Sequence, residues 1–275
     1  MSVYVRSVHS RPCSMSDDLT TATIDPPQKS LESMHRPDEL DQSFEGWSEE
    51  VFAMLDRLRA EPHIDQYKKE KPGVTEYLKD PFRRYRDDLV VNWVLPNRLG
   101  FETEKYVFSR LLKNDFGAGG CHDHLWMSFY RPETRRLEDV QITHRVSPDG
   151  FAVGIYVGAY ATDLLEQAQS RIQADPAGYL DLVNPLLARD DWRVSTHRGS
   201  GESKTKDVVT TPLSAVPESV EKADGIHVRH YIPRSETLDL GSELVDRALD
   251  LVFDVWPIYR FYLAEGAGEM DTVGE

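Results

Sequence analysis

The stretch Gln141–Val157, with the sequence QITHRVSPDGFAVGIYV, constrains the fold more than any other part of the chain. Two runs rich in β-branched and aromatic residues flank Ser147-Pro148-Asp149-Gly150. Proline presets φ for a turn, the aspartate side chain bonds nearby backbone, and glycine accepts a positive φ. The segment therefore predicts an antiparallel hairpin at the centre of a sheet.

Alternation along this hairpin gives each strand an inward side. Ile142, His144 and Val146 share one face of the first strand, because side chains two residues apart point the same way. Three further segments have the aromatic and β-branched composition of strands. They are residues 106–108, 124–130 and 226–232. We therefore predict an antiparallel sheet around residues 106–157, completed by Ile226–Ile232.

Helical spacing of apolar residues predicts the second kind of element. The expected helices run from Ser48 to Pro62, from Asp80 to Pro96, over Thr162–Ala174, over 176–187 and over Ser242–Trp256. The glycine- and serine-rich segment Arg193–Asp207 reads as a mobile loop. The predicted fold class is α+β, an antiparallel sheet with helices packed on one face.

Domain boundaries follow from composition. Residues 1–43 are rich in Ser, Thr, Asp and Pro and show no apolar period, so we expect a disordered N-terminal tail. Residues 44–265 form the single predicted domain, and 266–275 a C-terminal tail. A chain of 275 residues is long enough to bury a substantial core in that domain.

Charge and cysteine content narrow the classes of partner and compartment. The chain carries 47 acidic against 32 basic residues, a formal charge of -15, which repels nucleic-acid phosphates. No apolar run approaches the roughly 18 residues of a membrane span, so no membrane partner is expected. With Cys13 in the predicted tail and Cys121 the other cysteine, we expect no structural disulfide and a cytoplasmic location.

The segment Cys121-His122-Asp123-His124 carries the densest group of chemically active side chains. On a strand, His122 and His124 point to the same side, and His144 on a neighbouring strand is a conceivable third zinc ligand. No cysteine pair, His-Glu-x-x-His helix or second cluster accompanies them. We therefore predict no metal and no cofactor, and interpret these histidines as surface residues or binding residues.

Other motifs are incomplete. Gly117-Ala118-Gly119-Gly120 lacks the Gly-Lys-Ser/Thr ending of a phosphate loop. Cys121 and its neighbour His122 face opposite sides of a strand, so His122 is badly placed to activate the thiol. Arginines at 83, 84, 86, 131, 135 and 136, with Lys68, Lys69 and Lys71 and the aromatic residues 126–130, resemble a single-strand nucleic-acid surface. A solvated helix face balanced by acids is the favoured interpretation of those charges.

A family resemblance begins at the hairpin. Ser147–Tyr156, then Leu165 and Arg171-Ile172, then Asp175-Pro176, resembles the bacterial and fungal domain-of-unknown-function family numbered 2461. Trp256-Pro257-Ile258-Tyr259 resembles its last helix and, more loosely, that of a related small cytosolic family of unknown function. The likeness covers about residues 45–263. It implies an α+β domain without a known activity.

One family segment is only partly present. Arg110, Asp115 and Phe116 keep the family's order, whereas the Lys-x-Pro-Tyr-Lys element that follows in the family is missing. A family function that relies on that basic loop is therefore not transferred to this chain.

Two classes of function remain, with a third behind them. The first is a non-catalytic binding or regulatory module for an unknown protein or small molecule, because no catalytic motif is complete. The second is an enzyme, possibly hydrolytic, with a site on the open sheet face around His122, His124, His144 and Arg145. Arg110 joins these four as a candidate binding residue. A single-strand nucleic-acid binder is the third.

Overall fold

The computed structural model describes residues 22–114, 117–199 and 203–264. Its strands are β1 (Leu125–Phe129), β2 (Gln141–Ser147), β3 (Gly150–Gly158), β4 (Trp192–Arg198), β5 (Thr205–Val209) and β6 (Gly225–Pro233). Its α-helices are α1 (Glu49–Ala60), α2 (Ile64–Gly73), α3 (Asp80–Leu89), α4 (Thr162–Ala174), α5 (Pro176–Leu187), α6 (Glu218–Glu221), α7 (Arg234–Leu240) and α8 (Leu244–Leu263). Shorter helical turns are η1 (Pro26–Gln28), η4 (Arg136–Glu138) and η6 (Gly241–Glu243), and π-helical segments are η2 (Val74–Lys79) and η3 (Val90–Val94).

The six strands form one antiparallel sheet in the order β1-β2-β3-β6-β4-β5. The predicted hairpin is confirmed, with Ser147 paired to Gly150 and Gln141 to Tyr156. Gly150 has φ +131°, and a Cβ there would lie 2.1 Å from the carbonyl oxygen of Ile232. Both the turn and the neighbouring strand therefore require glycine at this position.

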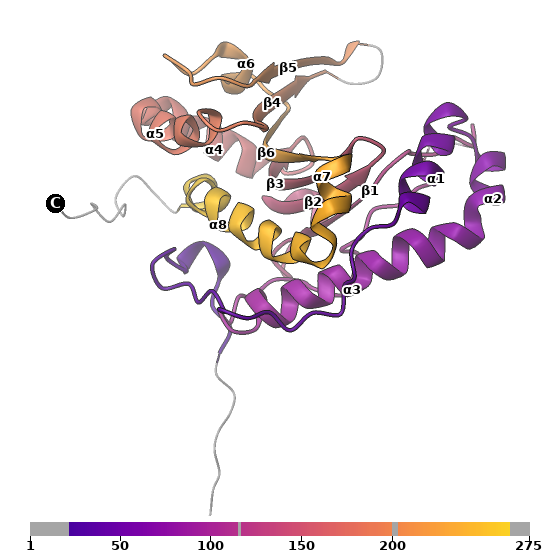
Figure 1. The fold of residues 1–275 in the computed structure, drawn as a ribbon. Coiled ribbons are helices and arrows are strands. Elements are labelled where there is room, and N and C mark those ends of the chain that lie inside the picture. The colour runs from indigo at the N-terminus through magenta and orange to yellow at the C-terminus, as the bar shows by residue number, and fades with distance from the viewer. Residues whose placement is uncertain (1–21, 115–116, 200–202, 265–275) are drawn as a thin grey trace, which may run out of the picture.

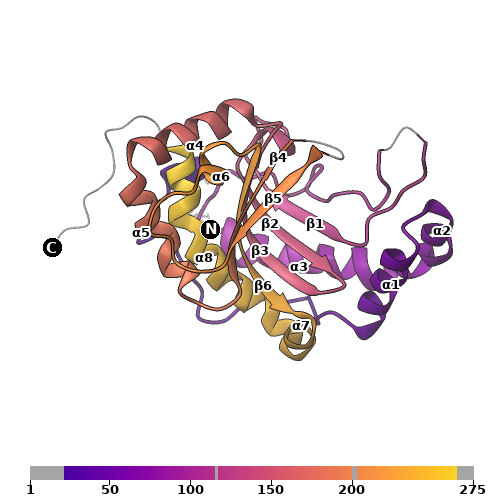
Figure 2. The same ribbon diagram turned by 90° about the horizontal axis from the view of Figure 1, so that it is seen from above.

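Helices α3, α4, α5 and α8 gather on one side of the sheet (Figures 1 and 2). This confirms the predicted fold class. The inward side chains of β2 and β3 are fully buried against these helices, as the alternation predicts. They are Ile142, His144, Val146, Phe151, Val153, Ile155 and Val157. Burial of each large apolar side chain contributes about 1.5–3 kcal/mol, so this layer is the main source of stability.

The helical region before the sheet is longer than predicted. The segment 64–94 is helical throughout, whereas the sequence predicts one helix that ends at Pro62 and another that begins at Asp80. Pro72 lies inside α2, and the π-helical η2 follows it directly. Proline removes a backbone donor, and a change to wider helical bonding lets the chain continue past it. Helix α2 has few apolar residues, because much of its surface faces solvent, so its sequence shows no helical spacing of apolar side chains.

The prediction of a mobile loop over Arg193–Asp207 is wrong for most of that segment. It forms the β4–β5 hairpin, with Val194 paired to Val209 and Arg198 to Thr205. β5 is an edge strand with exposed side chains, so polar residues suffice there. Conversely, Tyr106-Val107-Phe108 forms no regular strand and makes an isolated bridge from Phe108 to Met127 beside β1.

The expected disordered tail is wrong for residues 22–43. Met34 is buried, and the backbone of this strap is held by side chains of α3 and the turn after it. Asp88 accepts hydrogen bonds from the backbone amides of Ser43 and Phe44 at 2.8–3.0 Å. The side-chain amides of Asn92 and Asn97 each accept from a backbone N–H and donate to a backbone carbonyl, at Asp41 and His35 respectively. Because these hydrogen bonds come from side chains elsewhere in the chain, the sequence of residues 22–43 needs no periodic apolar residues.

The outermost predicted segments, residues 1–21 and 266–275, lie outside the described residues. Among the described helices, none combines the length and apolar character that crossing a membrane requires.

Candidate functional site

The sheet face opposite helices α3, α4, α5 and α8, which we call the polar face, has an unusual composition. Register between strands places its side chains in cross-strand rows. One row runs Ser128–Thr143–Gly154–Arg229–Arg193, and the next runs Trp126–Arg145–Ala152–Tyr231. A third row joins Gln141, Tyr156, His227 and Ser195. Arginines, aromatic rings and small residues thus lie side by side over five strands.

Arg145 on β2 and Arg229 on β6 flank the central strand β3. Between them β3 presents only Ala152 and Gly154 to the polar face. A Cβ at Gly154 would lie 2.5 Å from both Cα and Cβ of Arg229 and 2.1 Å from the Val228 carbonyl oxygen. Glycine therefore allows β6 to approach β3 this closely, and Arg145 and Arg229 lie on the two strands that flank β3.

Neither guanidinium has an acidic partner in the described part of the chain. Arg145 forms no ion pair or hydrogen bond there, and Arg229 contacts the Nδ1 atom of His227, an uncharged ring at neutral pH. Burial and then the charge of Arg229 lower the pKa of Arg145, and burial lowers the pKa of Arg229. Arginine nevertheless remains protonated at physiological pH. Two like charges are therefore held together, half-buried to buried, in an acidic protein.

Some of the buried polar atoms that lack a hydrogen-bond partner in the described part of the chain lie on this face. The Nε atoms of Arg145 and Arg229 belong to this group, together with Ser128 Oγ, Arg136 Nε and both amide atoms of Gln141. Buried polar groups in proteins are normally paired, since leaving one unpaired costs about 1–3 kcal/mol. Among the described residues, six of the fourteen atoms of this kind lie on the polar face, and two of the six belong to the charged side chains of Arg145 and Arg229.

Aromatic rings pack around the arginines. The Arg136 guanidinium lies 4.4 Å from the ring centroid of Trp126, and Arg193 lies 4.4 Å from that of Tyr231. Tyr156 stacks on His227 with centroids 4.1 Å apart. Cation–π contacts offset part of the lost hydration of arginine without neutralising its charge.

A histidine–aspartate pair lies at the end of the polar face nearest the hairpin turn. His124 Nδ1 is 2.9 Å from Asp123 Oδ1, and Arg59 Nε donates to Asp123 Oδ2 at 2.8 Å. Arg59 also makes a two-pronged bond to Asp149 in the turn, at 2.7 and 2.8 Å. The ring of His122 packs on that of His124, with centroids 5.0 Å apart. Strand β1, helix α1 and the turn thus fix one ionic network.

The pKa values of Asp123 and His124 are both lowered, but for different reasons. Burial alone would raise the pKa of Asp123, but hydrogen bonds from Arg59 and His124 lower it to about 2. Burial, followed by the charge of Arg145, lowers the pKa of His124 to about 4. Burial and then the charge of Lys113 lower the pKa of His122. At neutral pH the pair is therefore a carboxylate beside an uncharged imidazole.

The structure brings three of the five predicted site residues together. His122, His124 and Arg145 lie close enough for the Arg145 charge to act on both rings. His144 is wrong as a member of this site, because adjacent strand residues face opposite sides. Its ring is fully buried among the helices, with Nδ1 2.8 Å from the hydroxyl of Tyr85 on α3. Arg110 is exposed, and its charge adds to the effect of burial in lowering the pKa of Arg136.

Other sequence candidates have ordinary surroundings. Cys121 is buried and unbonded to another cysteine, with Sγ 3.6 Å from the His63 carbonyl oxygen. Several arginines of the supposed nucleic-acid surface are ion-paired, among them Arg83 with Asp80 and Arg131 with Asp139. Within the described ranges, no three His, Cys, Asp or Glu side chains gather in a way that suits a metal ion. Asp115 and Phe116 lie outside those ranges.

Arg229, Gln141 and Ser128 lie on the polar face but are not among the site residues predicted from sequence. Arg229 follows His227 in the alternating run 226–232, so period two could have placed both on one face. Its closeness to Arg145, however, depends on the order of strands β2, β3 and β6, which no local pattern encodes.

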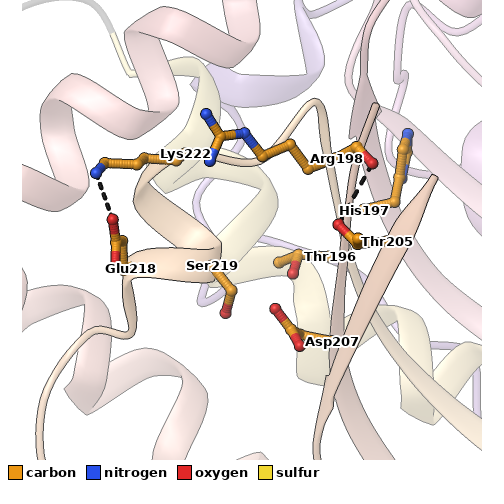
Figure 3. Close-up of a pocket in the computed structure, with 8 residues that line it drawn as sticks. All are labelled: Thr196, His197, Arg198, Thr205, Asp207, Glu218, Ser219 and Lys222. Atoms are coloured by element: carbon orange, nitrogen blue, oxygen red, sulfur yellow. Dashed lines mark hydrogen bonds and ion pairs between the residues drawn. The ribbon is translucent and has the colours of Figure 1, made fainter. Parts of the chain in front are cut away.

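A separate hollow of about 240 Å³ lies between the β4–β5 hairpin and α6 (Figure 3). It is lined by Thr196, His197, Arg198, Thr205, Asp207, Glu218, Ser219 and Lys222. Figure 3 shows Lys222 paired with Glu218, and His197 on the far side of the strand. None of these lining side chains carries a buried polar atom without a partner. The polar face, where buried atoms of two arginines lack partners, is therefore the better candidate.

Comparison with models of protein families and with curated proteins finds no match to this chain. The resemblance to the family numbered 2461 therefore stays a prediction.

Proposed function

We propose that this protein is a binding module whose polar face holds a small dianion of the phosphate class between Arg145 and Arg229. The supporting observation is the pair of guanidinium groups without any carboxylate partner among the described residues. Guanidinium groups recognise phosphate through charge-assisted, often two-pronged hydrogen bonds. A dianion would neutralise both charges and give the Nε atoms acceptors.

The alternatives fit this face less well. A single carboxylate would leave one of the two guanidinium charges uncompensated. A single-stranded nucleic acid would have to approach a chain of formal charge -15, and the predicted arginine surface is largely ion-paired. We keep the cytoplasmic location as part of the proposal, since nothing in the polar face depends on an oxidising compartment.

Calorimetric titration with inorganic phosphate and pyrophosphate tests the proposal. Charge-assisted hydrogen bonds contribute about 1.5–3 kcal/mol each, so Arg145→Gln or Arg229→Gln is expected to weaken binding by roughly 10- to 150-fold. Arg83→Gln is the matched control, because Arg83 is exposed on α3 and pairs only with Asp80. Affinity should also fall as salt rises.

Two results would overturn the proposal. Equal phosphate affinity in the wild type, Arg145→Gln and Arg229→Gln would place the anion elsewhere. Tighter retention of single-stranded DNA than of pyrophosphate at physiological salt would favour the nucleic-acid function instead.

A further inference from the structure

We infer that the polar face is a catalytic site, in which His124, oriented by Asp123, is the general base for hydrolysis of a phosphate monoester. The inference rests on the proposed function, because the ester's phosphoryl group would occupy the position between Arg145 and Arg229. It adds a reaction and a substrate class to that binding site.

The first support is the orientation of His124. The Asp123 carboxylate, 2.9 Å from Nδ1, favours the tautomer with the proton on Nδ1. The Nε2 atom then carries the lone pair, and it makes no hydrogen bond in the described part of the chain. A carboxylate that holds the imidazole in one tautomer while the other nitrogen faces the reacting group is the recurring arrangement of histidine bases.

The second support is the rigidity of Asp123. Arg59 on α1 donates to Asp123 at 2.8 Å and also holds Asp149 in the hairpin turn. The pKa of Asp123, at about 2, keeps the carboxylate charged over the whole physiological range. An ion pair that only joined α1 to the hairpin would need Arg59 and Asp149, but would have no use for a histidine bonded to a second carboxylate.

The third support is the position of His124 relative to the arginines. His124 directly precedes β1 and falls on the same side as Trp126, which is the cross-strand neighbour of Arg145. The Arg145 charge is close enough to contribute to the lowered pKa of His124, after the larger effect of burial. The imidazole is uncharged at neutral pH, so it is able to accept a proton beside a bound anion.

The proposed reaction consumes one water molecule. His124 Nε2 takes a proton from water while the water oxygen forms a bond to phosphorus, and the ester P–O bond breaks. The leaving alcohol oxygen keeps the bonding electron pair and takes a proton from solvent. His124 then returns its proton to solvent, which leaves inorganic phosphate, the alcohol and the unchanged enzyme. Arg145 and Arg229 stabilise the charge on the non-bridging oxygens.

Charge selects a monoester over a diester. A phosphate monoester carries two negative charges near neutral pH, which match two guanidinium groups, whereas a diester carries one. Carboxylic esters carry no charge on the reacting group, so the arginine pair offers them no comparable recognition.

The test uses the full chain with p-nitrophenyl phosphate, which releases a coloured alcohol. We expect His124→Gln to lower kcat/KM by at least about 100-fold, the usual effect of losing a general base. Its affinity for inorganic phosphate should stay within about threefold of the wild type, which shows that the variant is folded and that the site is intact. His35→Gln is the matched control, because His35 is exposed on the strap and uses only its backbone for bonding.

Asp123→Asn provides a second variant with a readout specific to orientation. We expect it to lower kcat with little change in KM and to alter the acid limb of the pH–rate profile, because an amide favours the other tautomer.

Three results would overturn the inference. They are absence of hydrolysis while phosphate still binds, full activity of His124→Gln, or hydrolysis of bis(p-nitrophenyl) phosphate in preference to the monoester. If phosphate binds but no ester is hydrolysed, the proposed binding function still holds. If the wild type does not bind phosphate, both the binding function and the hydrolytic activity are refuted.

Discussion

Replacement of His144 by glutamine should change how the stability of this protein depends on pH. Burial lowers the pKa of His144 to about 3, compared with about 6.5 in an unfolded chain. As the pH falls below about 6.5, the unfolded chain binds a proton at this position and the folded protein does not. The His144 contribution to stability is therefore complete above pH 6.5 and is lost progressively down to about pH 3.

The size of the effect follows from the same two values. A difference of about 3.5 units, at 1.36 kcal/mol per unit, corresponds to about 5 kcal/mol over the full range. Between pH 6.5 and pH 5.0 the expected loss is about 2 kcal/mol. Most carboxylates remain ionised in that interval, which makes it the useful window.

Urea unfolding of the wild type and His144→Gln at pH 6.5 and 5.0 measures this loss. Glutamine cannot titrate but still offers Tyr85 a hydrogen bond, so the variant should lose about 2 kcal/mol less than the wild type. His124 and His230, whose pKa values are also lowered to about 4, titrate in both proteins and cancel in the comparison. Equal losses in both proteins would refute the assignment of His144 to the core.

Two further substitutions test the strap and the arginine pair. Asp88→Ala removes the acceptor for two backbone amides and the Ser43 hydroxyl, so we expect a loss of about 3 kcal/mol in urea unfolding and faster amide exchange at Phe44. A loss below about 1 kcal/mol would mean that the strap is held by its apolar contacts alone. Arg145→Met removes a like charge and an unpartnered Nε, so the ligand-free protein should unfold at equal or higher urea concentration. A large destabilisation would instead make Arg145 a structural residue.

The parts of the fold predicted from sequence are those with a local signal. The turn at 147–150 needs proline, aspartate and glycine in that order, and β2 and β3 follow from period two. Thr162–Ala174 is helical as its apolar spacing predicts. The elements that were missed have no such signal. β5 is a polar edge strand, and the strap is held by Asp88, Asn92 and Asn97 from elsewhere in the chain.

The site was predictable only in part for the same reason. His122, His124 and Arg145 share a face by alternation, and the structure keeps them together. Including His144 contradicted that alternation, since a residue next to Arg145 in a strand must face the other way. Arg229 lies 84 positions further along the chain, and strand order alone brings it to the site.

His144 and Arg145 together explain why this sheet has two different faces. Both are polar residues in a buried strand, and each is short of hydrogen-bond partners. His144 faces the helices, where burial keeps it uncharged and Tyr85 supplies one partner. Arg145 cannot lose its charge in this way, because guanidinium stays protonated even when buried. Its charge forms no ion pair among the described residues, although the more distant charges of Asp123 and Asp149 act on it, which is why we propose a ligand on the polar face and not at the buried histidine.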